Sequence, residues 1–137
     1  MTTETTSALI QIGELADKTG LSLRTIRHYD EEGLLTPSAR SSGGFRLYSA
    51  DDVERLLVIR RMKPLGFSID EMRGLLALLH DLAEPHLKPA RKFELHDQLV
   101  TFTQNARERR EGLRVQLTMA EEFVAALEAV NPPSALD

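Results

Sequence analysis

Residues 12–32 read IGELADKTGLSLRTIRHYDEE, and this stretch decides the fold of the first half of the chain. A short apolar pattern over residues 12–18 predicts a helix, and Gly20 supplies the left-handed turn that ends it. Ser22 is a good N-cap for a second helix, which we expect to run to about Glu32 and to stop at Gly33. Two short helices joined by a glycine turn are typical of a helix-turn-helix.

The second of these helices carries cationic and hydrogen-bonding side chains, namely Arg24, Thr25, Arg27 and His28. An arginine on such a helix can donate two hydrogen bonds to guanine O6 and N7 in the major groove of DNA. The alternative is a small helical domain whose arginines are simply solvated. These residues alone leave both interpretations open.

A predicted hairpin follows the two helices. Ser41-Ser-Gly-Gly44 is a turn cluster, and Phe45-Arg-Leu-Tyr48 has the composition of a strand. Arg40 and Arg46 flank the turn, where cations suit contacts to phosphate beside a groove. A plain hairpin whose aromatic residues only pack inward is the alternative. With the preceding helices, the hairpin predicts a mainly α, winged helix-turn-helix domain.

Three more helices are expected. Ser49 caps a helix that reaches Met62, where Pro64 weakens the last turn and Gly66 ends it. Ser68 and Glu71 form a capping box for a helix to about Leu82. We therefore divide the chain into a disordered tail (1–9), a DNA-binding domain (10–82), a linker (83–90), a long helix (91–130) and a C-terminal tail (131–137).

The long helix shows a heptad pattern of apolar residues. Such a helix cannot bury both of its faces against a domain of this size, so we expect it to pair with a second copy of the chain. The expected dimerisation residues are Leu95, Leu99, Phe102, Ala106, Leu113, Leu117, Ala120, Val124 and Leu127.

Composition narrows the function classes. The net charge of −4 is unusual for a nucleic-acid-binding domain, but the cations cluster locally and DNA responds to charge within about 10 Å. The chain has no cysteine, no apolar run that could span a membrane and no secretion signal. It also has no nucleophile–base pair, phosphate-binding glycine loop or convergent carboxylate pair. We expect a cytoplasmic, nucleoid-associated protein that is not an enzyme, has no cofactor and does not contact a membrane.

The stretches IGELA (12–16), GLSLRTIRHYD (20–30), GLLTP (33–37), GFRLYS (44–49) and LGFSIDEM (65–72) resemble the MerR family of bacterial transcription regulators. The resemblance implies a winged helix-turn-helix domain and an antiparallel two-chain coiled coil. MerR-like homodimers bind pseudo-palindromic promoter sites. The two promoter boxes that RNA polymerase recognises are too far apart there, and the homodimer bends and untwists this double-stranded DNA so that RNA polymerase can engage.

The resemblance also implies roles for matching residues. Arg24 and Arg27 look like recognition-helix contacts, with Tyr29 at the end of that helix. Arg46 and Tyr48 look like wing contacts to phosphate. Arg60 and Lys63 look like contacts to the DNA backbone near a second wing. Two positions depart from the pattern: His28 stands where the family often has Tyr or Phe, and Pro64 should distort the turn that carries Lys63.

Family members that sense metals or redox state use cysteines, and this chain has none, so we do not expect it to sense either. Only residues 131–137 follow Val130, so we expect no separate ligand domain after the long helix. A ligand held in the dimer interface, or no effector, remains. A cluster of possible metal ligands has no recognised spacing, so we interpret it as exposed polar residues around the linker and expect no metal site: His80, Asp81, Glu84, His86, His96 and Asp97.

Arginines in a gap of the heptad pattern have two interpretations, a solvated flank with ion pairs along the helix or a polar patch that sets the antiparallel register. They are Arg107, Arg109, Arg110 and Arg114. Two rival functions also remain. One is an excisionase-like architectural protein that bends DNA without controlling transcription, and the other is a coiled-coil interaction protein with a vestigial helix-turn-helix.

Overall fold

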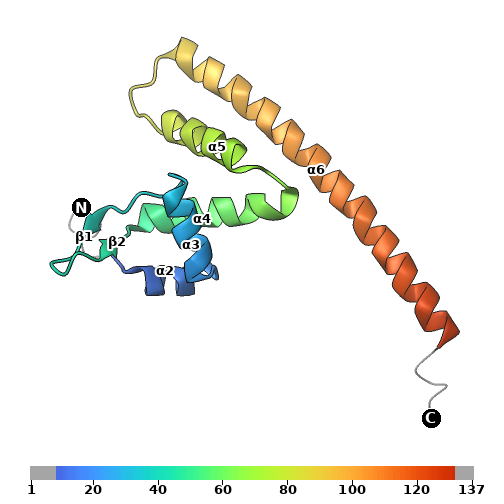
Figure 1. Ribbon diagram of the computed structural model, residues 1–137. Coiled ribbons are helices and arrows are strands. Elements are labelled where there is room, and N and C mark those ends of the chain that lie inside the picture. Colours follow the sequence, from blue (N-terminus) through green and yellow to red (C-terminus); the bar gives the residue numbers. More distant parts are fainter. Residues whose placement is uncertain (1–8, 132–137) are drawn as a thin grey trace.

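The computed structural model describes residues 9–131, so the two predicted tails lie almost wholly outside the described part. Helices and two short strands follow in the order α2 (Ile12–Thr19), α3 (Leu23–Glu31), β1 (Ala39–Arg40), β2 (Arg46–Leu47), α4 (Ala50–Met62), the 3₁₀ helix η1 (Lys63–Leu65), α5 (Ile69–Leu82) and α6 (Pro89–Val130). In Figure 1, α2, α3 and α4 form a cluster beside the hairpin, α5 lies along the first half of α6, and the second half of α6 extends away from everything else.

The predicted helix-turn-helix is confirmed in α2 and α3. Gly20 ends α2 with φ at +73°, and its N–H donates to the Ala16 carbonyl at 2.8 Å. The Ser22 hydroxyl accepts from the Thr25 N–H at 3.1 Å, as expected of an N-cap. The turn is also stabilised by Thr19, a fully buried residue whose hydroxyl donates to the Leu15 carbonyl at 2.8 Å, a contact that the sequence pattern did not predict.

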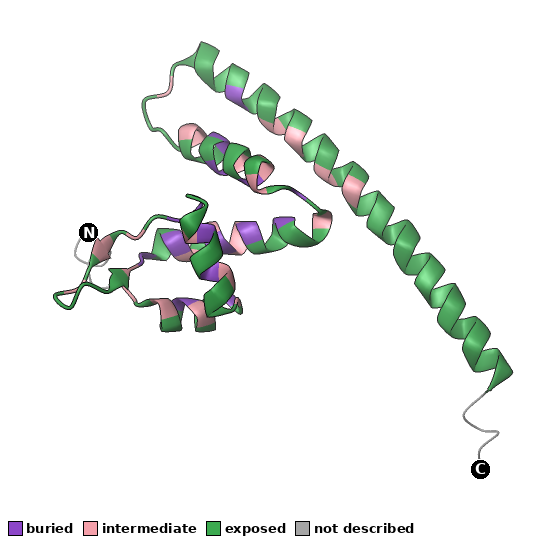
Figure 2. Cartoon of the chain, in the orientation of Figure 1, coloured by how far each residue is buried: buried purple, intermediate pink, exposed green. Residues whose placement is uncertain are grey.

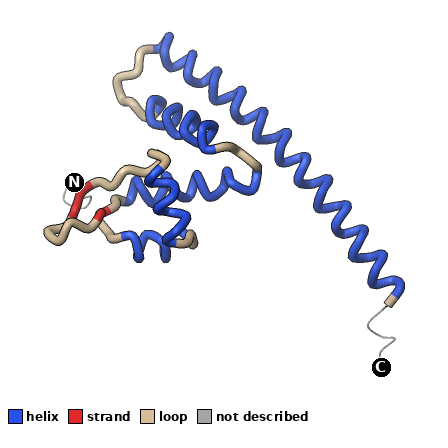
Figure 3. Tube along the Cα trace, in the orientation of Figure 1, coloured by secondary structure: helices blue, strands red, loops and turns tan. Residues whose placement is uncertain are grey.

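The hairpin is present but its strands are shorter than expected. Ala39 pairs with Leu47 and Arg40 with Arg46 in an antiparallel register, and a long turn joins the two strands (Figure 3). Tyr48, predicted as part of the second strand, instead pairs with Ile10 through two backbone hydrogen bonds of 2.7 and 2.8 Å. The segment before α2 therefore ties the base of the hairpin to the helices.

The start of α4 is held by a capping box. The Ser49 hydroxyl accepts from the Asp52 N–H at 3.2 Å, and the Asp52 carboxylate accepts from the Ser49 N–H at 2.8 Å. Proline at position 64 has the expected effect, since α4 ends at Met62 and the chain continues as η1 until Gly66, where φ is +79°.

We expect Ser49→Ala to lower the free energy of unfolding by about 1 kcal/mol, because the first N–H groups of α4 lose an acceptor in a nearly buried position. Urea denaturation followed by circular dichroism measures the loss. Ser42→Ala in the exposed hairpin turn is the matched control and should change stability little. Equal stability of the two variants would contradict the importance of this cap.

Helix α6 has 42 residues and is about 63 Å long. It begins at Pro89 instead of residue 91, because proline is tolerated in the first turn of a helix, where its missing N–H would have no partner. None of the helices in residues 9–131 is long and apolar enough to cross a membrane.

The two halves of α6 have different surroundings. Leu95 is 1% exposed, and Phe102 and Ala106 pack on the core of the chain's own domain, with Phe102 stacked on Phe67 at 5.0 Å between ring centroids. Every residue from 111 to 130 is exposed (Figure 2). The assignment of Leu95 as a dimerisation residue is therefore corrected, because α5 folds back along α6 and Leu95 is buried within the same chain. Phe102 and Ala106 are only half-buried, so their part in a dimer stays a prediction. Leu99 is half-buried beside them.

Candidate nucleic-acid interface

Helix α3 separates its side chains cleanly between core and surface. Ile26 and Tyr29 are buried, whereas Arg24, Arg27 and His28 are exposed. Residues three and four positions apart share one face of a helix, so these three cationic or polar groups lie together. Their placement on the second helix of the helix-turn-helix is the one that suits contact with base edges in a major groove.

Two hollows flank the exposed face of α3, and each contains cations from another element. One lies toward the hairpin and includes Arg27 and Arg46, with Glu31, Phe45 and Ile12, the first residue of α2. The other lies toward the end of α4 and includes Arg24, Thr25, His28, Tyr29, Arg60 and Lys63. The fold thus gathers most of the predicted contact residues on one surface, although they come from α3, β2, α4 and η1.

The hairpin is anchored to α3 through Asp30, a residue whose role the sequence pattern did not predict. Its carboxylate accepts from the Tyr48 hydroxyl at 3.0 Å and pairs with the Arg46 guanidinium at 2.7 Å, while its side chain is only 10% exposed. An acid in the last turn of a cationic helix was the available signal. Because Arg46 is still 44% exposed, its remaining N–H groups are free to reach a phosphate.

Tyr48 is not a surface group. It is fully buried, and its pKa is raised, mainly by burial and to a lesser extent by its hydrogen bond with Asp30. The expectation that Tyr48 touches phosphate is therefore corrected: its ring fills the core, and its hydroxyl holds Asp30, which in turn holds Arg46. This position supports the wing from inside instead of contacting a ligand.

Tyr29 is also nearly buried, at 4% exposed, and burial raises its pKa. It lies at the edge of the hollow that contains Arg24 and His28, so only part of the ring is accessible to a ligand. The His28 ring lies 5.9 Å from it in a tilted arrangement. A contact from Tyr29 to DNA stays a prediction.

The remaining cations differ in how they are held. Arg60 donates to the Thr19 carbonyl at 2.6 Å and so joins α4 to the end of α2, although the residue as a whole is exposed. Arg40 donates to the Gly44 carbonyl at 3.1 Å and stabilises the hairpin turn. Lys63 is exposed on η1, directly before Pro64.

Two other expectations concern polar clusters. Within residues 9–131, no three His, Asp or Glu side chains come together as a set that could hold a metal ion. Among the gap arginines, Arg114 pairs with Glu111 at 3.0 Å, as expected of an exposed flank. Arg109 differs, because it pairs at 3.0 Å with Glu71 on α5 and therefore belongs to contacts within the chain.

Comparison with known proteins agrees with this geometry. The family described as MerR HTH family regulatory protein matches residues 10–79, and the family described as MerR, DNA binding matches residues 53–120. A nodulation protein, NolA of Bradyrhizobium elkanii, is 36% identical over 126 residues, which cover 88% of this chain and 55% of NolA. The chain spans about half the length of the curated relatives it matches.

Solved structures show the same fold. A MerR family transcriptional regulator from Bacillus cereus is 25% identical, with a TM-score of 0.61 and coverage of 88% of this chain and 78% of that one. HiNmlR, a MerR family regulator lacking the sensor domain and bound to promoter DNA, is 22% identical with a TM-score of 0.62, covering 92% of this chain and 95% of that one. The helix-turn-helix, the wing and the family matches over most of its length establish that the chain belongs to the MerR family of regulatory proteins.

Proposed function

We propose that this chain is a transcriptional regulator that binds a pseudo-palindromic promoter site as a homodimer and distorts the DNA between the two half-sites. The observation that carries the proposal is the cationic surface around α3, where Arg24 and Arg27 are exposed between Arg46 on one side and Arg60 and Lys63 on the other. Arginines on the recognition helix suit base edges, while the flanking cations suit phosphates.

The exposed half of α6 supports a dimer. Its apolar seam has no cover within the described residues and consists of Leu113, Leu117, Ala120, Val124 and Leu127. An apolar groove also lies beside the first half of α6, between α4 and α5, and includes Met62, Leu65, Leu79, Leu99 and Phe102. In an antiparallel pair, the exposed half of each α6 would lie next to the groove of the other chain, so a single two-fold axis would cover both apolar surfaces.

In this proposal, the DNA is distorted wherever the spacing of its half-sites does not match the dimer. A long rigid helix pair holds two recognition helices at a set distance, whereas the two half-sites on duplex DNA have a separation and rotation set by their spacing. Where the distance between the recognition helices does not match that between the half-sites, the DNA must bend or untwist. This deformation costs roughly 1–6 kcal/mol, which the protein–DNA contacts offset. The structure of HiNmlR on promoter DNA supports promoter binding here, and engagement of RNA polymerase rests on the family resemblance.

The test begins with selection of duplexes from a random-sequence pool by the full chain. We expect the selected duplexes to contain two inverted half-sites, and their affinity to fall steeply as salt rises because bound counterions are released. Failure to bind any duplex in dilute buffer would contradict the proposal. Transcription in vitro from a promoter containing the selected site then separates a regulator from an architectural protein, which would bend the DNA without changing the amount of transcript.

A further inference from the structure

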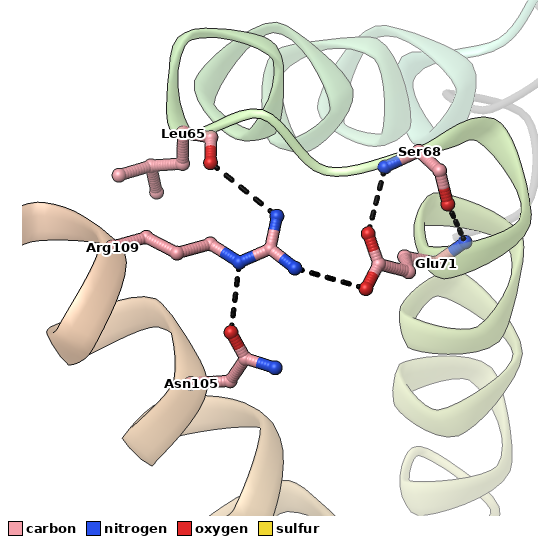
Figure 4. Close-up of polar contacts among 5 residues, drawn as sticks. All are labelled: Leu65, Ser68, Glu71, Asn105 and Arg109. Atoms are coloured by element: carbon pink, nitrogen blue, oxygen red, sulfur yellow. Dashed lines mark hydrogen bonds and ion pairs between the residues drawn. The ribbon is translucent and has the colours of Figure 1, made fainter.

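Arg109 on α6 contacts three different parts of the chain (Figure 4). Its guanidinium donates to the Glu71 carboxylate on α5 at 3.0 Å and to the Leu65 carbonyl in η1 at 3.4 Å. Its Nε donates to the Asn105 side chain one turn earlier on α6, at 2.8 Å, which orients the guanidinium. A single side chain therefore joins α6 to both ends of the turn between η1 and α5.

The same guanidinium lies over the ring of Phe67, with its central carbon 4.0 Å from the ring centroid. Phe67 in turn stacks on Phe102 of α6. A cation over an aromatic face is attracted to the ring, and the arginine side chain is only 28% exposed, so solvent screens these contacts incompletely. Only a planar guanidinium has donors in the directions that this arrangement needs, which a lysine ammonium cannot reproduce.

Glu71 has a second role that makes the contact rigid. One carboxylate oxygen accepts from the Ser68 N–H at 2.8 Å in the capping box of α5, and the other accepts from Arg109. The pKa of Glu71 is lowered, first by this backbone hydrogen bond and then by the charge of Arg109, so the carboxylate is charged at neutral pH. The direction of α6 is thereby tied to the first turn of α5.

The contacts of Arg109 with Leu65, Glu71 and Phe67, called the Arg109 clasp below, hold the turn between η1 and α5. This turn is next to the cationic surface around α3. Leu65 ends η1, whose first residue is Lys63, and η1 continues α4, which carries Arg60. The recognition surface and the dimerisation half of α6 therefore meet at Arg109. From Arg109 to Val130 the helix is about 32 Å long, so a tilt of about 10° at the clasp would move its end by about 5 Å, more than the rise of about 3.4 Å per base pair.

We propose that Arg109 is a positioning residue that sets which half-site spacing the dimer prefers, by holding α6 at one angle to the η1–α5 turn through Leu65, Glu71 and Phe67. The proposal rests on the proposed function, since spacing has meaning only for a dimer on two half-sites. A residue that merely stabilised the fold would change affinity equally at every spacing. A residue that sets the angle changes the dependence of affinity on spacing.

The experiment uses the full chain and the selected operator, with its spacer shortened or lengthened by one and two base pairs. Fluorescence anisotropy measures the Kd for each duplex and for an isolated half-site. We expect the wild type to lose about tenfold in affinity for each base pair from its best spacing, as the deformation cost of DNA allows. Arg109→Met should bind the half-site within about twofold of wild type and vary less than about threefold across the same spacings.

Three further variants sharpen the comparison. Arg109→Lys should behave like Arg109→Met, because an ammonium cannot contact Leu65, Glu71 and the Phe67 ring together. Glu71→Gln removes the charge from the other side of the clasp and should also flatten the spacing profile, which keeps the test available if the arginine variants are unstable. Gln104→Met, at an exposed position of α6 outside the apolar seam and the gap arginines, is the control and should keep the wild-type profile.

The outcomes are distinguishable. A wild-type protein that prefers one spacing, together with Arg109→Met and Glu71→Gln variants that keep the same preference, would overturn the role of Arg109 and leave the proposed function intact. A uniform loss at all spacings would also overturn it, in favour of a purely stabilising contact. A wild-type protein that binds paired half-sites no better than one would overturn the proposed function itself.

Discussion

Arg27→Ala is expected to weaken binding to the selected operator by about 1–3 kcal/mol while leaving binding to random DNA almost unchanged. Arg27 is exposed on the recognition face of α3, and a bidentate contact to guanine is lost on any other base. Competition titrations with operator and random duplexes at one salt concentration measure both affinities. The ratio of operator affinity to random-DNA affinity should therefore fall by the same factor as the operator affinity.

The matched control is Lys63→Ala. Lys63 is exposed on η1 and makes no ion pair with any described residue, so its removal should weaken binding to all sequences alike and reduce the slope of affinity against salt by about 1. Arg46→Ala should also act on all sequences, with an added effect because the ion pair with Asp30 anchors the hairpin. If Arg27→Ala lowered the affinity for operator and for random DNA by the same factor, a role of Arg27 in reading bases would be contradicted.

Leu117→Asp is expected to convert the proposed dimer into a monomer and to lower operator affinity about a hundredfold or more, because two linked half-site contacts become independent. Leu117 is 59% exposed in the single chain and is one of the uncovered seam residues. A carboxylate there would have to be buried without a partner in the dimer, which costs several kcal/mol. Sedimentation equilibrium measures the mass, and anisotropy measures the affinity.

Thr118→Asp is the control for this substitution, since it adds the same charge at the next position, outside the seam. It should leave both the mass and the operator affinity close to those of the wild type. The half-site affinity of Leu117→Asp should also be unchanged, because Leu117 lies in the exposed half of α6, which extends away from the helix-turn-helix (Figure 1). Leu117→Asp protein that still sediments as a dimer would contradict the proposed arrangement.

The chain's local signals account for what the sequence predicted well. Gly20, Gly33 and Gly66 each adopt a positive φ at the end of an element, and Ser22, Ser49 and Ser68 each cap the helix that the sequence predicted. These effects act within a few residues and do not depend on the rest of the fold. The helix-turn-helix, the position of the hairpin and the extent of α6 could therefore be predicted to within about two residues.

The tertiary structure alone decided what covers each face. Heptad spacing shows that Leu95 and Leu117 share one stripe of α6, but it does not show that α5 covers Leu95 while Leu117 stays exposed. Likewise, the burial of Tyr48 against Asp30 and the clasp between Arg109 and Glu71 join residues 18 and 38 positions apart. Periodicity specifies which side chains point the same way, whereas the partner of a face depends on how distant elements pack, and no short stretch of this chain carries that information.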